Sequence, residues 1–234
     1  GARVAAFGAG AWAERAAFGT DSIAVVPEQV DLVRAAALPM TGLTALRSLR
    51  AAGPALGSRV LVTGASGAVG RLAVQLARRS GAHVIASVSR PERARRLTET
   101  PAAGSATVEV VVGLDGVEPV DIAIETVGGP TLVTAWSLLK PGGNLQSIGW
   151  ASEQSAAFPP NSTFSLGPAK SLNSFGDVAA PAADLAQLLA LVATGELSVE
   201  IGWHGSWGDL EGAKAAQLDR SVAGKITLKV GQAA

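Results

Sequence analysis

The sequence contains no cysteine, and this absence excludes several kinds of chemistry at once. Without thiols the 234 residues can form no disulfide, no thiolate zinc site and no cysteine nucleophile. Tyrosine is absent as well, and the chain has only one methionine and two histidines. We therefore expect these residues to bind no metal ion, and we expect any chemistry to depend on other side chains or on a cofactor.

The charge balance argues against a nucleic-acid or membrane partner. Lys and Arg number 19, Asp and Glu also number 19, and the formal net charge is zero. Nucleic acids and anionic membranes attract proteins that carry a basic excess. No apolar run reaches about 18 residues, the length needed to span a bilayer, and no charged-then-apolar leader is visible. We expect a soluble, cytoplasmic protein that acts on a small molecule.

Strands and helices alternate through the middle of the chain. A short β-branched run predicts a strand at 59–63. Further strands are predicted at 83–88, 108–112, 120–125, 144–148 and 171–175. Helices are predicted over 68–80, from Pro91 onward, up to Leu139 and over 182–193. Buried strands separated by amphipathic helices predict a parallel sheet covered on both faces. The ends differ: residues 1–37 suggest short strands with glycine turns, and residues 196–234 suggest one helix and a last strand at 225–230.

A glycine-rich turn, G-A-S-G-A-V-G, follows the first of these strands at residues 64–70. Between a strand and a helix, such a turn presents free backbone N–H groups and the positive end of the helix dipole to a pyrophosphate. Gly64 permits the sharp turn, Gly67 lets the backbone approach the phosphates, and Gly70 lets the helix pack close to the strand. The sequence predicts a dinucleotide site here, and a glycine turn without a ligand is the alternative.

The end of the next strand indicates which dinucleotide is bound. An NAD site usually has an acidic residue about 20 residues after the turn, whereas an NADP site uses hydroxyls and a cation for the 2′-phosphate. This chain has Ser89 and Arg90 there, and Glu92 follows Pro91 as a residue of the first helical turn. We therefore predict NADP(H), with Arg93 as a possible helper. The alternative is a solvent-facing arginine beside a turn serine.

Several further segments carry a family resemblance. They are G-A-R-V at 1–4, G-A-W-A-E at 10–14, A-A-A-L-P-M-T-G-L-T-A-L at 35–46, V-L-V-T-G-A-S-G-A-V-G-R-L-A-V-Q-L-A at 60–77, and the stretches 121–129, 139–149 and 224–226. In this order they resemble the zinc-independent medium-chain dehydrogenase/reductases, in their quinone oxidoreductase-like branch. The resemblance implies a Rossmann domain, a doubly wound parallel sheet, over 38–195. It also implies remnants of a GroES-like β-barrel catalytic domain, at 1–37 and in a return segment at 196–234.

The resemblance also implies contacts to the cofactor. Gly64, Ala65, Ser66, Gly67, Ala68 and Val69 would line the pyrophosphate, and Ser89 and Arg90 would bind the 2′-phosphate. Thr126, Val127, Gly128, Gly149 and Trp150 would border the nicotinamide half, with Thr44, Ser174, Phe175 and Lys225 also near the cofactor. Simpler readings stay open for four of these residues: a helix-face hydroxyl for Thr44, core or dimer packing for Trp150 and Phe175, and a solvated lysine for Lys225.

Two departures from the family pattern affect the expected chemistry. Zinc-dependent relatives have a cysteine where this chain has Met40, so we expect a zinc-free site. The family's catalytic domain begins some tens of residues before the position of Gly1, so we expect most of the substrate-binding domain to be missing from this sequence.

The implied activity is hydride transfer from NADPH to an enone, a quinone or a related carbonyl compound, with the cofactor performing the chemistry. No catalytic side chain is assigned. His83 and His204 are expected in the core or on the surface, and Lys170 and Ser171 could approach the pocket. Short-chain dehydrogenases share the glycine pattern, but they need a tyrosine that this chain lacks.

Two other functions stay open, and so does the oligomeric state. The chain could bind NADP(H) without turnover, as a scaffold, a sensor or half of a split enzyme. It could also be an enoyl-reductase domain of a multidomain synthase. Residues 171–175 form a suitable exposed edge strand, so we predict a homodimer that pairs this strand across a two-fold axis.

Overall fold

The computed structural model describes residues 1–98, 107–164, 166–219 and 222–231. The chain forms two compact units, a central unit over Thr44–Asp177 and a terminal unit that combines Gly1–Leu43 with Val178–Ala234. The first boundary falls inside helix α1 (Leu32–Ala52), and helix α5 (Ala182–Ala193) groups with the chain ends. These limits differ from the expected 38–195, and the assignment of the ends to a catalytic domain stays a prediction.

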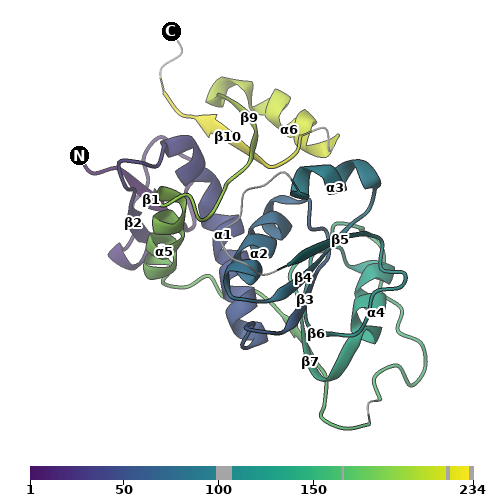
Figure 1. The fold of residues 1–234 in the computed structure, drawn as a ribbon. Helices are drawn as coiled ribbons and strands as arrows, with labels where there is room; N and C mark the ends of the chain where they lie inside the picture. Colours follow the sequence, from purple (N-terminus) through teal and green to yellow (C-terminus); the bar gives the residue numbers. More distant parts are fainter. Residues whose placement is uncertain (99–106, 165, 220–221, 232–234) are drawn as a thin grey trace. The chain divides into compact units, whose positions relative to one another are not determined.

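The central unit contains a six-stranded parallel sheet in the order β5-β4-β3-β6-β7-β8 (Figure 1). The strands are β3 (Arg59–Val62), β4 (His83–Val88), β5 (Val108–Val112), β6 (Val120–Glu125), β7 (Leu139–Ser147) and β8 (Ser171–Ser174). The chain runs outward from β3 to β5, then returns and runs outward from β6 to β8. This is the doubly wound order of a Rossmann sheet, with its switch point between β3 and β6. The predicted fold class is confirmed.

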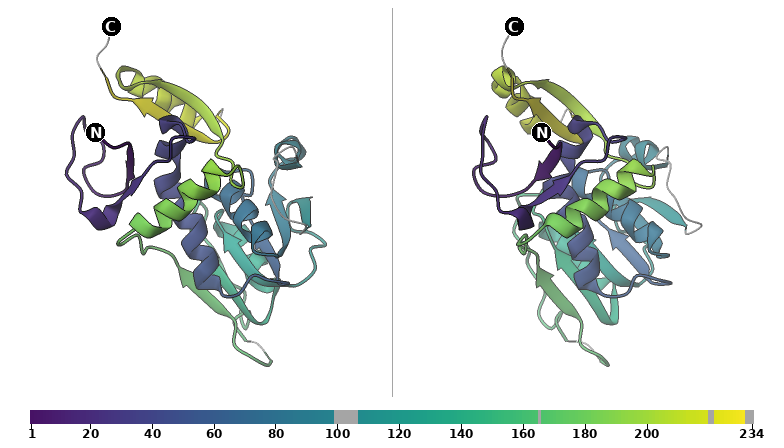
Figure 2. Two further views of the ribbon diagram at one scale, coloured as in Figure 1. Left: turned by 60° about the vertical axis from the view of Figure 1, so that its left-hand side comes forward. Right: turned by 90° about the vertical axis from the view of Figure 1, so that its left-hand side faces the viewer.

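Helices α2 (Ala68–Arg79) and α4 (Gly129–Ser137) lie on opposite sides of this sheet, and α3 (Pro91–Thr98) packs against β4 and β5 (Figures 1 and 2). The strand register places Leu61, Ile85, Ala123 and Leu145 side by side on one face. Leu132, Ala135 and Trp136 of α4 complete that core cluster. Side chains alternate between the faces of a strand, so both faces of these apolar strands become buried.

Two predicted boundaries near α4 are wrong. The helix ends at Ser137, and β7 already begins at Leu139, five residues before the expected strand. Val120 pairs with Leu139 but Ile122 pairs with Asn144, so the register shifts between these two pairs. The Pro-Gly-Gly sequence at 141–143 is therefore an irregular part of a strand, because a bulge absorbs the extra residues.

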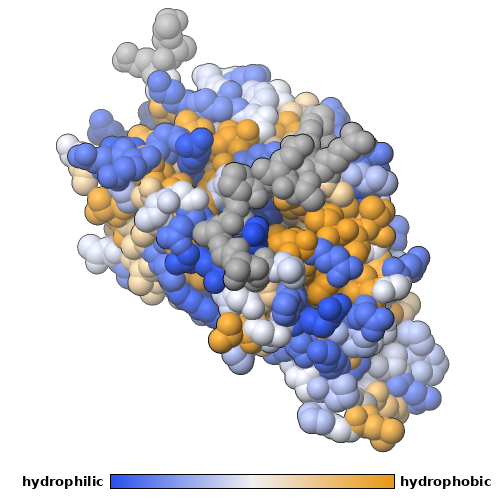
Figure 3. All heavy atoms as spheres, viewed as in Figure 1, coloured by the Kyte–Doolittle hydropathy of each residue, from blue (hydrophilic) through white to orange (hydrophobic). Residues whose placement is uncertain are grey.

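The loop between β7 and β8 is attached to α4 through Trp136. The Trp136 indole Nε1 donates to the carbonyl of Ser162 (2.9 Å), and the ring lies edge-on to Phe158 at 6.4 Å. Figure 3 shows apolar surface at the tip of this loop, where Phe164 is 81% and Leu166 is 96% exposed.

Lys170 lies close to the same tryptophan, because its Nζ is 5.7 Å from the Trp136 ring centroid. Lys170 and Ser171 stand where β8 starts, at the amino edge of the sheet. The alternative that these two residues approach the pocket is therefore not supported by the direction of the strand.

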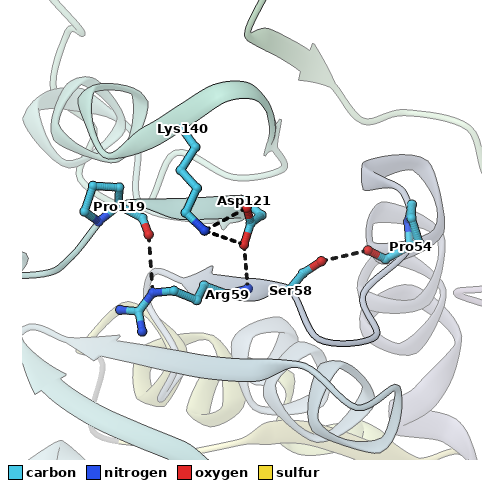
Figure 4. Close-up of polar contacts among 6 residues, drawn as sticks. All are labelled: Pro54, Ser58, Arg59, Pro119, Asp121 and Lys140. Carbon is cyan, nitrogen blue, oxygen red and sulfur yellow. Dashed lines mark hydrogen bonds and ion pairs between the residues drawn. The ribbon is translucent and has the colours of Figure 1, made fainter. Parts of the chain in front are cut away.

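Polar contacts join β3, β6 and β7 at this amino edge (Figure 4). The Asp121 carboxylate accepts from the backbone N–H of Arg59 at 2.8 Å and from Lys140 Nζ at 2.9 and 3.0 Å. Arg59 Nε also donates to the carbonyl of Pro119 at 3.3 Å. Burial raises the pKa of Asp121, but the hydrogen bonds from Arg59 and Lys140 and their positive charges outweigh it, so the pKa is lowered.

The terminal unit holds two small sheets. Strand β1 (Val4–Ala6) pairs antiparallel with β2 (Ile23–Val25), and β9 (Ile201–Ser206) pairs parallel with β10 (Lys225–Lys229). Helix α6 (Leu210–Leu218) packs against β9 and β10. Trp12 and Trp207 form an aromatic pair at 5.4 Å.

Two expectations for this unit are wrong. Strands and turns do not continue to residue 37, because α1 begins at Leu32. Residues 196–234 contain β9, which the sequence did not predict, since Gly202 and Gly205 lower its strand propensity.

Within the described residues, no helix is long and apolar enough to cross a membrane.

Candidate dinucleotide-binding site

Three glycines shape the turn between β3 and α2. Gly64 has φ +57°, a left-handed conformation that favours glycine, and a side chain there would collide with the Thr126 hydroxyl. A side chain at Gly70 would overlap the Gly64 carbonyl oxygen and lie 2.8 Å from Ala65 Cα. Packing within the protein therefore requires both glycines, as the sequence predicted. At Gly67 an added Cβ would meet only the Gly64 oxygen, at 3.2 Å, among the residues that the structure describes.

The turn leaves a group of backbone N–H donors unused. Among the described residues no acceptor serves the N–H groups of Ser66, Ala68, Val69 and Gly70, whereas Ala65 N–H donates to Ser87 O at 3.0 Å and Gly67 N–H donates to Gly64 O at 2.9 Å. Helix α2 has no side-chain cap and no acidic residue in its first turn. Its N-terminus therefore presents free donors and the positive end of the helix dipole at the switch point of the sheet. This arrangement fits an anion such as a pyrophosphate.

Ala65 has a different place from its neighbours. Its side chain is fully buried and its N–H is bonded to β4, so it fixes the turn to the adjacent strand. Ser66, Ala68 and Val69 are half-buried, and Gly67 is exposed. Direct contact of each of these residues with a ligand stays a prediction.

Ser89 and Arg90 are exposed directly after β4. The backbone N–H of Arg93 donates to the Arg90 carbonyl at 3.1 Å and so opens α3 beside them. Among the described residues, no hydrogen bond or ion pair engages the Arg90 guanidinium. A hydroxyl and an uncompensated cation therefore stand together at the carboxyl edge of β4.

A buried carboxylate joins the ends of β3 and β6. Glu125 is fully buried and accepts from the Thr63 hydroxyl (2.9 Å) and from the N–H groups of Val127 (2.9 Å) and Gly128 (2.9 Å). Thr126 strengthens the link, because its N–H donates to the Thr63 hydroxyl at 3.0 Å and its own hydroxyl donates to the Thr63 carbonyl at 2.9 Å. Burial raises the pKa of Glu125, and the hydrogen bonds from Val127, Gly128 and Thr63 oppose this rise without cancelling it.

Glu125 was not among the predicted site residues. In the sequence it is only the last residue of the strand predicted at 120–125. The available signal was an acidic residue at the end of an otherwise apolar strand, but its importance depends on the pairing of β3 with β6.

Trp150 packs against the same strand end. A Cβ added at Gly128, which has φ +73°, would lie 2.6 Å from Trp150 Cδ2, so the indole rests on the glycine backbone. Trp150 Nε1 donates to the Gln154 carbonyl (2.6 Å), and the side chain is 47% exposed. A Cβ at Gly149 would lie 2.8 Å from the Thr126 carbonyl oxygen. Residues 126–128 and 149–150 therefore form one wall beside the phosphate turn.

The other predicted residues are more scattered. Ser174 is exposed at the end of β8, and the half-buried Phe175 donates its N–H to the Ser147 carbonyl at 3.3 Å. Thr44 is buried on α1 in the central unit. Lys225 belongs to the terminal unit, where burial lowers its pKa, and its contact with a cofactor stays a prediction.

The described residues contain no group of three or more His, Cys, Asp or Glu side chains that could hold a metal ion.

Comparison with known proteins places this geometry in a family. The zinc-binding dehydrogenase family matches residues 68–194, more than half of the chain. Relatives include a probable quinone oxidoreductase of Schizosaccharomyces pombe, 33% identical over 155 residues, or 64% of this chain and 47% of the relative. The acryloyl-coenzyme A reductase of Sulfurisphaera tokodaii is 29% identical over 231 residues, or 94% of this chain and 65% of the relative.

Larger proteins and a solved structure also match. The spectinabilin polyketide synthase system protein NorB of Streptomyces orinoci is 37% identical over 140 residues, which are 58% of this chain and 6% of that protein. The crystal structure of AibC superposes with a TM-score of 0.75 and 28% identity, covering 91% of this chain and 60% of AibC. The chain thus spans less than two thirds of each of these proteins. It belongs to the zinc-binding dehydrogenase family, in the quinone oxidoreductase-like branch of the medium-chain dehydrogenase/reductases.

Proposed function

We propose that this chain binds NADP(H) along the carboxyl edge of its central sheet and serves in hydride transfer to an enone, a quinone or a related carbonyl compound. The observation that carries the proposal is the set of unused N–H groups at the N-terminus of α2, placed at the switch point between β3 and β6. A dinucleotide pyrophosphate supplies the negative charge and the acceptor oxygens that these donors lack.

The preference for NADP(H) over NAD(H) is supported by the residues after β4. A 2′-phosphate carries charge that the exposed Arg90 guanidinium can bind, and Ser89 adds a hydroxyl donor beside it. No carboxylate stands at these two positions to repel the phosphate.

The substrate class is supported by the relatives. Their names refer to quinones and to acryloyl-coenzyme A, which share a C=C bond conjugated to a carbonyl group. When bound, the cofactor supplies the hydride, and the protein's part is to hold the nicotinamide against the electron-poor carbon. A zinc-free site is supported by the absence of cysteine and by Met40 at the position where zinc-dependent relatives have that ligand.

The 2′-phosphate contact can be tested with Arg90→Gln. This substitution is expected to weaken NADPH binding about 10- to 100-fold, because a charge-assisted bond contributes about 1.5–3 kcal/mol, and to leave NADH binding within about twofold. Arg59→Gln is the matched control, since it removes the same charge from the amino edge of the same sheet (Figure 4). Equal losses of affinity for NADPH and NADH in Arg90→Gln would contradict the assignment. The proposed hydride transfer is tested separately, as NADPH oxidation by the unsubstituted protein with small quinones and enones.

A second candidate, an enoyl-reductase domain of a multidomain synthase, is favoured by the match to NorB. It shares the cofactor site and differs in the substrate carrier. Faster reduction of enoyl thioesters of pantetheine than of free quinones would favour the synthase domain. NADPH binding without turnover of either would instead favour a scaffold, a sensor or half of a split enzyme.

A further inference from the structure

The Glu125 carboxylate has no cationic partner among the residues that the structure describes. It is fully buried, and every contact it makes among the described residues comes from a donor: the Thr63 hydroxyl and the N–H groups of Val127 and Gly128. In the described part of the chain, each of these donors to the carboxylate is an uncharged group. Burial raises the pKa of Glu125. The surrounding donors, with no acceptor among them, oppose that rise and favour the ionised form of the carboxyl group.

Glu125 lies at the switch point of the sheet, where a bound dinucleotide would be close to its carboxylate. Glu125 ends β6 next to the phosphate turn, and its hydrogen bonds hold residues 127 and 128. An added Cβ at Gly64 would touch Thr126 and lie 3.2 Å from Val127 Cγ2, so the turn after β6 and the phosphate turn are in contact. A dinucleotide bound at the phosphate turn would thus lie along the end of β6, where this carboxylate is located.

The same hydrogen bonds remove the nearby backbone as a ligand for the cofactor. The N–H groups of Val127 and Gly128 donate to Glu125, and the Val127 carbonyl accepts from Ser152 N–H at 2.8 Å. With the N–H groups of residues 127 and 128 engaged, this strand end can offer a bound ring the Val127 side chain and the field of the carboxylate behind it, and the Trp150 indole lies beside them.

Resting on the proposed function, we propose that Glu125 makes the site favour the oxidised, positively charged nicotinamide over the reduced, neutral one. The two cofactor forms differ by one unit of charge on the ring, so a fixed anion nearby acts on their difference in binding. The same field lowers the cost of the positive charge that develops as hydride leaves. Glu125 is therefore a positioning residue that also sets the redox preference of the site.

The expected size follows from Coulomb's law. A unit charge roughly 10 Å from the ring, in an effective dielectric constant of about 20 to 40, changes the preference about 4- to 15-fold. The measured quantity is the ratio of the NADPH dissociation constant to the NADP⁺ dissociation constant. Glu125→Gln should lower this ratio by that factor, chiefly by weakening NADP⁺.

Three comparison proteins separate charge from shape. Glu125→Asp keeps the charge and should keep the ratio near that of the unsubstituted protein. Thr63→Val removes a hydrogen bond to Glu125 but no charge, so it should move both dissociation constants together. Asp121→Asn neutralises a carboxylate on the same strand at the opposite edge, beside Lys140, and should leave the ratio within about twofold.

The outcomes are distinct. If neither cofactor form binds the unsubstituted protein, the proposed function fails. If both bind and Glu125→Gln leaves the ratio unchanged, or Asp121→Asn changes it as much, the role of Glu125 is refuted. If Glu125→Gln does not fold, the proposal is tested by the two dissociation constants of the unsubstituted protein. It should bind NADP⁺ at least as tightly as NADPH, and tighter binding of NADPH would overturn the proposal.

Discussion

Gly67 and Gly70 lie three residues apart on one turn, yet the structure predicts different effects when each is changed to alanine. Gly70→Ala should lower stability, and Gly67→Ala should weaken cofactor binding. At Gly70 the new Cβ would press on backbone atoms, namely the Gly64 carbonyl oxygen and Ala65 Cα at 2.8 Å. Backbone cannot rotate away as a flexible side chain can, so α2 must move from β3. At Gly67 the new Cβ would have, in the described part of the chain, only the Gly64 oxygen within 4 Å, at 3.2 Å, and φ is an ordinary −76°.

These contacts set the expected magnitudes. Overpacking at Gly70 should cost about 1–3 kcal/mol of unfolding free energy, which lowers the melting temperature by roughly 3–10 °C for a chain of this size. Gly67→Ala should change stability by less than about 1 kcal/mol, because a small strain is offset by the lower entropy of the unfolded chain. Its methyl group would, however, occupy space that we assign to the pyrophosphate, so NADPH binding should weaken at least about tenfold, or about 1.4 kcal/mol.

The assay pairs thermal unfolding without ligand and titration with NADPH followed by tryptophan fluorescence. Gly70→Ala should shift the melting curve, and Gly67→Ala should shift the binding curve alone. If Gly67→Ala binds NADPH as the unsubstituted protein does, the assigned approach of phosphates to the turn is wrong. If Gly70→Ala unfolds at the unsubstituted temperature, the close packing of α2 on β3 is wrong.

Three other predictions concern stability and assembly. The pKa of Asp121 is lowered in the folded state, so its carboxylate stabilises the fold at pH values above the unfolded pKa of 3.8, and this stabilisation is lost as the pH falls through the folded pKa. Asp121→Asn should therefore reduce the loss of unfolding free energy between pH 6 and pH 2, measured by denaturant unfolding. An unchanged pH dependence would contradict the ion pair with Lys140. Trp136→Phe removes the donor to Ser162 and should cost about 0.5–1.5 kcal/mol of unfolding free energy, whereas no loss in equilibrium unfolding would show that this bond does not anchor the loop. Strand β8 is the last strand in the order of the central sheet, so we expect it to pair with a second copy and to give a solution mass near twice 23.4 kDa by light scattering. A single-chain mass at micromolar concentration would reject the dimer.

The parts of the fold that the sequence predicts well are those fixed by local rules. The phosphate turn needs glycine at Gly64 and Gly70 because of a left-handed φ and a backbone contact, and both requirements act within seven residues. Strands β3, β4 and β6 are short and largely apolar, and helices separate several of the central strands, which indicates a parallel sheet before any pairing is known.

The features that the sequence did not predict depend on residues far apart in the chain or on segments with a weak local pattern. Thr63 and Glu125 are 62 residues apart, and only the pairing of β3 with β6 makes them neighbours. The start of α1 is rich in alanine and contains Pro39 inside the helix, so it lacks a clear polar face with helical period. Strand β9 depends on its pairing with β10, because its two glycines favour no strand by themselves.

The central claim is that free N–H groups at the start of α2 hold the pyrophosphate of NADP(H). The most direct measurement is the melting temperature of the unsubstituted chain with NADPH and, separately, with NADH at equal concentration. NADPH at about one hundred times its dissociation constant should add about 2.7 kcal/mol of stability, which raises the melting temperature by roughly 5–10 °C, and NADH should raise it less. A melting temperature that neither dinucleotide moves would contradict the account.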